Sequence, residues 1–559
     1  MRTWLSFILA ATTATSAWGQ ARPQVANPVQ NLPRVETPKA TPNITFNVQQ
    51  QQQNTQLAAL LASTLTPTHI NIVGVHSIPF DEISALFKPL TGKSVRIADL
   101  VAAADACSKH YQAHGYALSF CYVPAQSFEN GIVNVTVVEG YVAEVVISGD
   151  AGTLTKKIQA IARHITADRP LRKATFDRYL QVLGMLPGAK IAANVPAPTT
   201  TDGATRLELS VTRRRFNSSA GIDFNHPGIQ GLLNGMLNGL TPLGEQITAS
   251  VIYPQGRVSQ EFYAAGYSQM LGSTGLIGKL DGSHFYGNPD INTQLPSYLR
   301  HRLSQDRLGF SFSYPLLLSP SQSLLATASI YGSNQNDSYL NTLNGASLQF
   351  KTNVRVLQAG LDYTQAGTKQ VRKFSFSISH GFDLWGAGAN THSNIPGTDL
   401  SAATDTRFTR YNFSALQGNT WGAHIGTVAS LIGQYSNNRL PSSEQISFGG
   451  PRFGLAYDPG EISGDSGWGA AFEVNRPFTY PSTWLKTLTP YTVAQFARTY
   501  LNSPSQSFNE LRTMALGMRL SDGKHYTIDF SAAQPIGTLP PNHDGRHPRY
   551  NLSFSYQLE

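Results

Sequence analysis

The sequence predicts small α+β modules followed by a transmembrane antiparallel β-barrel of about 16 strands. Up to residue 214 strand and helix periodicities alternate, whereas from residue 217 onward the helical period disappears. The final segment, RYNLSFSYQLE, shows the repeating unit of this second part, because its apolar side chains share one face of an extended strand. Those side chains are Tyr550, Leu552, Phe554, Tyr556 and Leu558.

The barrel follows from the length of the apolar runs. Beyond the N-terminus no segment approaches the ~18 consecutive apolar residues of a helical span, so a membrane protein of this sequence must cross as a closed barrel. The mean hydropathy of -0.20 fits alternating lipid-facing and lumen-facing residues. About 22 residues per strand and connection give close to sixteen strands over residues 217–559. A soluble sandwich, propeller or β-solenoid is the alternative.

Residues 1–19 have the layout of a cleaved secretory signal peptide. A basic residue precedes an apolar stretch from Trp4 to Ala11, and a small-x-small site follows, so the mature chain is expected to begin near Gln20. An N-terminal anchor helix is the alternative, although the apolar run is shorter than the ~20 residues that a spanning helix needs.

Three regions are expected between the leader and the barrel. Residues 20–66 read as a Pro- and Gln-rich linker whose apolar patch, at 55–65, is a possible short helix. Residues 67–140 and 141–214 each follow the order strand, helix, helix, strand, strand, and so form a repeated β-α-α-β-β unit. The longer predicted helices are residues 96–114, 154–165 and 173–186.

Cys107 and Cys121 are the only cysteines and fall within the first predicted module. In an exported domain an oxidising compartment favours a disulfide between them. A pair of free thiols is the alternative that the spacing leaves open.

No pattern predicts an enzyme, a cofactor or a metal site. GDSG at 464–467 is similar to the segment around a protease nucleophile, but no His and Asp with protease-type flanks accompany Ser466. GKS at 92–94 lacks the upstream Gly of a phosphate loop, since Phe87 stands there. The 14 His residues are scattered without metal-ligand spacing. The net charge of +8 comes without a basic run, so no nucleic-acid partner is expected.

Short motifs in the first module fall at a distinctive spacing, within LTGKSVRIADL and YQAHGYALSFCYVPAQSFENGIVNVTVVEGYV. On these residues the sequence resembles the POTRA domain of TpsB transporters, the haemolysin and filamentous-haemagglutinin transporters of the ShlB/FhaC/HecB family. The resemblance continues through AGID at 220–223, TPLGEQITASV at 241–251 and a segment at 447–468, so it covers nearly the whole chain. The matching POTRA positions are Gly115, Tyr116, Pro124, Gln126, Gly131, Val138, Glu139 and Gly140.

The segment at 447–468, SFGGPRFGLAYDPGEISGDSGW, resembles a long loop that in this family folds back inside the barrel. Each Gly or Asp alone indicates only a turn, whereas the combination is specific to the family. The loop positions are Gly449, Gly450, Pro451, Arg452, Leu455, Tyr457, Gly460, Glu461, Gly464, Asp465 and Gly467.

Two places depart from the family pattern. Leu455 and Ala456 stand where the loop motif V-R-G-Y carries Arg and Gly, and on a later strand Gln495 and Ala497 stand where the family has Asp and Gly. The resemblance implies that this Arg and Asp pair inside the barrel to hold the loop. Loss of both charged residues is more tolerable than loss of one, because a buried charge without its partner destabilises the folded protein by several kcal/mol. We expect a divergent loop, held by packing of Leu455 or by Arg452; a degenerate transporter is the alternative.

The resemblance implies a protein of the Gram-negative outer membrane, with two POTRA domains (67–140 and 141–214) in the periplasm and a barrel at 215–559. It is expected to capture a large, partly unfolded secreted partner of adhesin or haemolysin type and to pass it through the barrel. The other expected partners are outer-membrane lipid and the barrel assembly machinery; no cofactor is expected. A client can pair with a POTRA edge strand through backbone hydrogen bonds, in a groove beside the helix at 96–114.

Two other functions are open at this point. An insertase for outer-membrane barrel proteins belongs to the same superfamily, but two POTRA modules behind a Pro- and Gln-rich linker favour secretion, where an N-terminal segment can plug the pore. The patch at 55–65 is a weak plug candidate, because its polar face is mostly Ser, Thr and Gln. A passive porin or adhesin is disfavoured by the duplicated modules.

Overall fold

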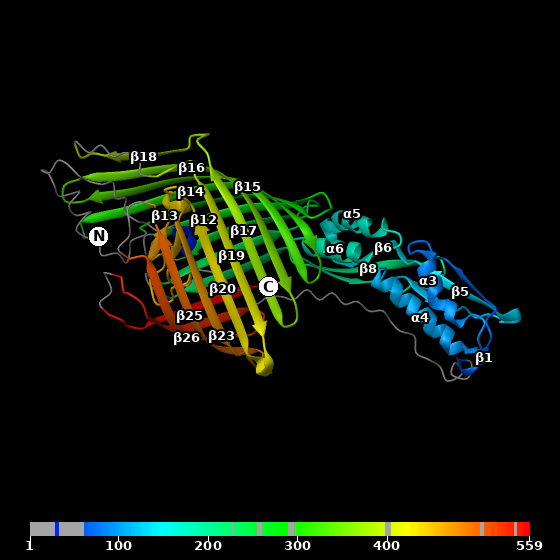
Figure 1. The fold of residues 1–559 in the computed structure, drawn as a ribbon. Coiled ribbons are helices and arrows are strands. Elements are labelled where there is room, and N and C mark those ends of the chain that lie inside the picture. Colours follow the sequence, from blue (N-terminus) through cyan, green and yellow to red (C-terminus); the bar gives the residue numbers. More distant parts are fainter. Residues whose placement is uncertain are drawn as a thin grey trace.

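The molecule has a barrel at one end, and two pairs of helices, α5 with α6 and α3 with α4, extend away from it (Figure 1). The predicted signal peptide, residues 1–19, lies outside the described residues, as does most of the predicted linker. The computed structural model describes residues 28–32, 61–198, 200–225, 228–253, 260–288, 296, 298–396, 404–502, 508–540 and 545–558.

The first module packs two helices on a three-stranded sheet. Its elements are β1 (Thr64–Leu65), β2 (His69–Val73), α3 (Phe80–Phe87), β3 (Val95–Arg96), α4 (Ile97–Ala113), β4 (Phe120–Tyr122) and β5 (Ile132–Val138). The sheet order is β2-β5-β4, so β4 lies at one edge. In α4 the residues Ile97, Leu100, Ala104, Cys107 and Tyr111 recur at three- and four-residue steps, and this buried stripe faces the sheet.

The second module repeats this plan. Its elements are β6 (Tyr141–Gly149), α5 (Thr155–Thr166), α6 (Lys173–Gly184), β7 (Ala189–Asn194) and β8 (Ala204–Arg213). The sheet order is β6-β8-β7, and the core contains the fully buried Ile158, Ile161, Leu183, Leu207 and Leu209. The three long helices begin and end within two residues of their predicted limits. The domain limits themselves stay predictions.

Within the part of the chain that the structure describes, no helix combines the length and the apolar character that a membrane crossing needs.

Sixteen antiparallel strands close the barrel, as expected, and β28 pairs with β9 to complete the ring. A short strand, β18 (Gly388–Ser393), continues β17 along β16, and β24 (Phe478–Thr479) pairs with the start of β25. The barrel strands are β9 (Phe216–Asp223), β10 (Gln230–Asn238), β11 (Glu245–Tyr253), β12 (Gln260–Leu271), β13 (Leu276–Gly287), β14 (Leu299–Leu318), β15 (Gln322–Asn341), β16 (Ser347–Ala366), β17 (Gln370–Gly381), β19 (Thr409–Thr420), β20 (Gly426–Tyr435), β23 (Ser466–Asn475), β25 (Thr487–Tyr500), β26 (Glu510–Ser521), β27 (Tyr526–Pro535) and β28 (Arg549–Leu558).

The strands turn their apolar faces outward. On β14, Leu308 and Phe310 are 63% and 41% exposed, and on β28 Tyr550 is 65% exposed while its neighbour Asn551 is 8% exposed. A lipid-facing wall with a polar lumen requires this alternation. The predicted faces of these strands are therefore confirmed.

The second module is seated on the tight turns of the barrel. Lys157 Nζ on α5 donates to the carbonyl oxygen of Met270 at 2.6 Å, at the end of β12. Arg178 Nη2 on α6 donates to the Tyr314 hydroxyl at 3.1 Å and to the Pro315 carbonyl at 3.0 Å. Outer-membrane barrels have their short turns on the periplasmic side, so these contacts place the helical modules on that side.

Candidate functional site

A long loop folds back inside the barrel. Residues 436–465 connect β20 to β23 and contain η6 (Ser442–Glu444), β21 (Ile446–Phe448) and β22 (Ile462–Gly464). β21 and β22 form an antiparallel hairpin. The loop therefore begins earlier than the predicted 447–468 and ends at Asp465. Gly467, expected in the loop, lies on β23 instead, because it pairs with β20 and β25 in the barrel wall.

The hairpin packs on the inner face of β25 and β26. Burying each large apolar side chain contributes about 1.5–3 kcal/mol, so this contact area holds much of the loop in place. The Tyr457 hydroxyl also donates to the carbonyl oxygen of Arg512 at 3.2 Å. The buried cluster consists of Ile446, Phe448, Ala456, Tyr457 and Ile462 from the loop and Tyr491, Val493, Ala497, Leu511, Ala515 and Ala533 from the wall.

The Gly and Asp residues of the loop motif shape its turns. Gly449 has a φ of 129°, and a Cβ there would overlap the carbonyl oxygen of Asp458. Asp465 is 1% exposed, and its carboxylate accepts the N–H groups of Leu440 at 2.8 Å and Asn502 at 2.9 Å, which ties the two ends of the loop to each other and to the segment that follows β25. The other motif residues, Gly450, Pro451, Gly460, Glu461 and Gly464, lie in or beside the hairpin.

The two departures from the family pattern lie against each other. The backbone N–H of Leu455 donates to Gln495 Oε1 at 2.9 Å, and the Leu455 carbonyl accepts from Asn551 Nδ2 at 3.0 Å. The Leu455 side chain packs against the buried cluster. This chain therefore has neutral hydrogen bonds and apolar packing at the position where the resemblance implied an ion pair. Arg452, the other expected anchor, donates to the side chain of Gln30.

An ion pair that the sequence analysis missed joins the loop to another part of the wall, at β19. Arg410 Nη1 on β19 lies 2.7 Å from Glu444 Oε2, and the two side chains are 11% and 4% exposed. The Tyr331 hydroxyl donates to the same carboxylate at 2.8 Å. Next to this pair, Gln335 Nε2 on β15 donates to Ser442 Oγ at 2.7 Å. Here the wall supplies the cation and the loop supplies the anion.

One feature of the sequence could have identified Glu444 as a functional residue. It is the only charged residue between Arg439 and Arg452, in the otherwise neutral run LPSSEQISFGGP. Its partner Arg410 is one of several Arg residues on alternating strands and has no distinguishing pattern, so the pair emerges only when the loop is placed in the lumen.

A short N-terminal segment also lies inside the barrel. Residues 28–32, the dark blue piece among the barrel strands in Figure 1, contain η1 (Pro28–Asn31). Gln30 Nε2 donates to the carbonyl oxygen of Gln445 at 3.2 Å, and Gln30 Oε1 accepts from Ser447 Oγ at 3.2 Å. Val29 and Leu32 pack against a buried group on the wall, which consists of Ile252, Phe262, Phe285 and Leu303.

The described end of the patch at 55–65 contains two helical residues, Leu61 and Ala62, but it does not plug the barrel. Thr64 and Leu65 form β1, which pairs with β3 in the first module, far along the chain from the barrel. Residues 55–60 lie outside the described residues. Leu65 packs into the core of that module, so the described end of the patch serves the module, and an earlier part of the linker enters the lumen.

Glu139 ties the first module together. Its carboxylate accepts the backbone N–H groups of His76 and Ser77 at 2.8 Å, the Ser77 hydroxyl at 2.8 Å and the Tyr111 hydroxyl at 2.9 Å. Burial alone would raise the pKa of Glu139, but these four hydrogen bonds outweigh burial and lower that pKa below its usual value. The motif glutamate thus fastens α4 and the turn after β2 to the sheet.

The other POTRA motif residues hold the module and its junction with the next one. A Cβ on Gly140 would lie 2.4 Å from the Leu118 carbonyl, so only glycine fits there. Gln126 exchanges hydrogen bonds with the backbone of Asn134, both at 2.8 Å. Tyr116 packs on the core. Among the remaining motif positions, Gly115 and Gly131 have positive φ. Pro124 follows β4, and Val138 is the last residue of β5.

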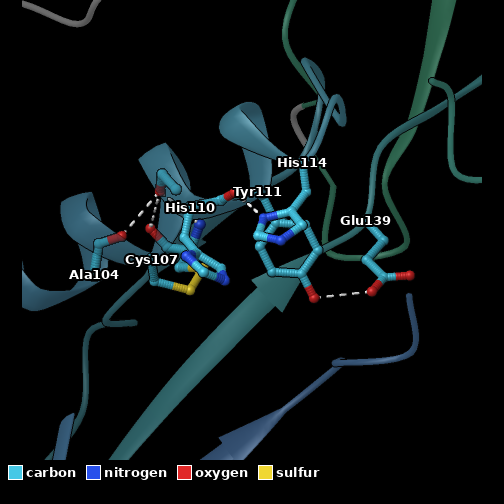
Figure 2. Close-up of a disulfide and its surroundings, with 8 residues drawn as sticks. Ala104, Cys107, His110, Tyr111, His114 and Glu139 are labelled. Carbon is cyan, nitrogen blue, oxygen red and sulfur yellow. Dashed lines mark hydrogen bonds between the residues drawn. A yellow bond between two sulfur atoms is a disulfide. The ribbon is translucent and has the colours of Figure 1, made fainter. Parts of the chain in front are cut away.

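Cys107 and Cys121 form a disulfide with a Cα–Cα distance of 5.9 Å. Figure 2 shows Cys107 on the same stretch of helix α4 as Tyr111, whose hydroxyl meets Glu139. Since Cys121 lies on β4, the bond fastens the helix to the edge strand of the sheet. The edge strand is therefore held beside α4 by a covalent link.

Family profiles match both parts of the chain. The ShlB-type POTRA domain matches residues 65–140, and the haemolysin secretion/activation protein ShlB/FhaC/HecB matches residues 305–520. A similar protein is the heme/hemopexin transporter protein HuxB of Haemophilus influenzae (strain 86-028NP). It is 22% identical over 483 residues, which cover 83% of this chain and 82% of HuxB.

Two solved structures are similar in fold. CdiB from Escherichia coli has a TM-score of 0.67 at 17% identity and covers 91% of this chain and 93% of its own. BamA from Haemophilus ducreyi, lacking POTRA domains 1-3, has a TM-score of 0.51 at 12% identity, over 88% of this chain and 100% of its own. The family profiles match the POTRA module and the part of the barrel that contains the inward loop. The chain therefore belongs to the ShlB/FhaC/HecB family of TpsB transporters, which are outer-membrane barrels with POTRA domains in the periplasm.

Proposed function

We propose that this transporter captures one large, partly unfolded exoprotein, of adhesin or haemolysin type, at the β4 edge of its first POTRA domain. Membership of the TpsB family implies a secreted exoprotein partner in two-partner secretion. The client then passes through the barrel lumen to the cell surface. Outer-membrane lipid surrounds the barrel, and the barrel assembly machinery inserts it.

The observation that supports this proposal is that two segments of the chain occupy the barrel lumen. Two segments, residues 28–32 and 436–465, fill space inside a closed sixteen-strand barrel, and neither is a wall strand. A barrel of this size is wide enough to conduct once such contents move. Gln30 makes three side-chain hydrogen bonds to the loop, and water can replace each of them when the N-terminal segment leaves.

Capture has a physical route in the first module. β4 pairs with β5 in the sheet order β2-β5-β4, so it lies at an edge of the sheet. The backbone N–H and C=O of Cys121 bond to Ser108 Oγ on α4, at 2.9 and 3.3 Å, and an extended chain that pairs with this edge would replace those two hydrogen bonds. Such pairing depends on the client backbone and tolerates many sequences, which suits a large unfolded client. The disulfide between Cys107 and Cys121 keeps α4 beside this edge while the client binds.

The test compares the proteins exported by cells with and without this transporter. We expect loss of the transporter to remove one large protein from the cell surface and the medium, while the other outer-membrane barrels keep their levels. An insertase, the second candidate, would instead deplete many barrel proteins at once. Quantitative mass spectrometry of the surface, the medium and the outer membrane distinguishes these outcomes. The likeness to BamA concerns the fold alone and does not favour the insertase.

Deleting residues 28–32 is expected to give larger or steadier openings than the intact protein shows in a planar lipid bilayer. The reason is that the segment occupies lumen volume between the loop and the wall formed by Ile252 and Phe285. Single-channel recording measures the change, and an equal deletion within the glutamine run at 49–53 is the control. Unchanged conductance in both variants would refute the plug, and no conductance in any form would favour the insertase.

A further inference from the structure

Three metal-ligating side chains converge on the first module. His110 lies in the last turn of α4, His114 is the C-cap residue four positions later, and Glu82 reaches them from α3. His110 Nε2 is 2.9 Å and His114 Nε2 is 3.7 Å from Glu82 Oε2. The three possible ligand atoms all lie within 4.8 Å of one another. Figure 2 shows both imidazoles projecting from the stretch of helix that carries Cys107 and Tyr111.

These distances match a transition-metal site. Bonds of ~2.0–2.1 Å to a tetrahedral zinc ion hold neighbouring ligand atoms ~3.3–3.5 Å apart, and the two measured distances to Glu82 lie on either side of that value. Two imidazoles and one carboxylate are a donor set that zinc uses with a fourth position left to water. The side chains are 28%, 46% and 45% exposed for His110, His114 and Glu82, so an ion and a water molecule can reach them.

The tautomer of the neutral His114 ring suits metal binding. Its Nδ1 lies 2.9 Å from the carbonyl oxygen of His110, and since a carbonyl only accepts, Nδ1 carries the proton. In the neutral ring Nε2 is then the nitrogen with the lone pair, and it lies 3.7 Å from Glu82 Oε2. A hydrogen bond from the second ring nitrogen to a backbone carbonyl is the usual support of a histidine ligand.

We propose that Glu82, His110 and His114 bind one divalent transition-metal ion, zinc in the first place. The ion would join α3 to α4, two helices that the disulfide does not link to each other, and so stabilise the module whatever client it takes. The sequence analysis predicted no metal, because the ligands come from two helices and Glu82 lies 28 residues before His110.

The experiment uses the full-length protein, without a histidine tag, in detergent micelles. After equilibration with zinc and removal of free metal, we expect about one more zinc per chain in the intact protein than in Glu82→Gln, His110→Gln or His114→Gln. Each of these variants should bind at least about tenfold more weakly in competition with a chelator. Cobalt in place of zinc should give the visible absorption of a four-coordinate ion in the intact protein only.

His284→Gln is the matched control, because His284 forms an exposed pair with Asp306, at 2.6 Å, that belongs to no three-ligand cluster among the described residues. This variant should bind zinc as the intact protein does. Circular dichroism checks that the variants are folded, and Glu82→Gln keeps the shape and a hydrogen bond to His110. Absence of bound zinc in the intact protein, or equal zinc in the intact protein and the three ligand variants, would overturn the proposal and leave a simple His–Glu pair.

Discussion

Arg410→Ala is expected to release the inward loop from its place in the lumen. The change leaves Glu444, which is 4% exposed, as a buried carboxylate without its cation, and breaking such a pair costs about 3–5 kcal/mol. The barrel strands keep their backbone hydrogen bonds, so the cost falls on the loop. A cysteine introduced at Ser447, which is 0% exposed, reports the release through its labelling by a membrane-impermeant maleimide. We expect labelling to accelerate about tenfold or more, the factor that ~1.4 kcal/mol produces.

Two further variants identify the ion pair as the cause. Arg410→Met combined with Glu444→Gln removes both charges, and the glutamine amide oxygen would still accept from the Tyr331 hydroxyl, so this double variant should label more slowly than Arg410→Ala. Lys279→Ala breaks an exposed pair with Asp281 on β13, which is worth about 0–1 kcal/mol, and should not change labelling. Labelling as slow in Arg410→Ala as in Lys279→Ala would show that the loop is held by packing alone.

Leu455→Arg is expected to impair secretion more than the double change with Gln495→Asp. The single variant places a guanidinium against the buried cluster and beside a neutral amide, and an uncompensated charge costs up to about 3–5 kcal/mol where it is fully buried. The second change supplies the carboxylate at the position that already meets the loop backbone at 2.9 Å. The measurement is the amount of exoprotein at the cell surface, normalised to the amount of folded transporter.

Leu455→Met is the control for this pair, because a volume-conserving apolar exchange costs less than about 1.5 kcal/mol and should leave secretion near its original level. Equal impairment in the single and the double variant would remove the coupling between the two positions. The neutral contact of Leu455 with Gln495 would then be independent of the charge at either site.

The periodicities of the chain were enough to predict the fold, and the resemblance of its motifs at 115–140 and 447–468 was enough to predict the family. The alternation of apolar and polar residues predicted the barrel, since lipid leaves no other way to satisfy the backbone of these short strands. The three- and four-residue steps in α4 and its counterparts predicted the helices of both modules. Both periodicities are local, because each can be recognised from the residues of a single strand or helix.

The contacts that hold the lumen and the candidate metal site are not local. Arg410 meets Glu444 on a loop that folds inward, Gln30 meets Arg452 from the other end of the chain, and Glu82 meets His110 from another helix. No periodicity links such partners, and an alternating strand offers many polar positions that face the same lumen. Which of them pair depends on how deep the loop and the N-terminal segment sit in the closed barrel, because a buried charge is stable only where its partner reaches it.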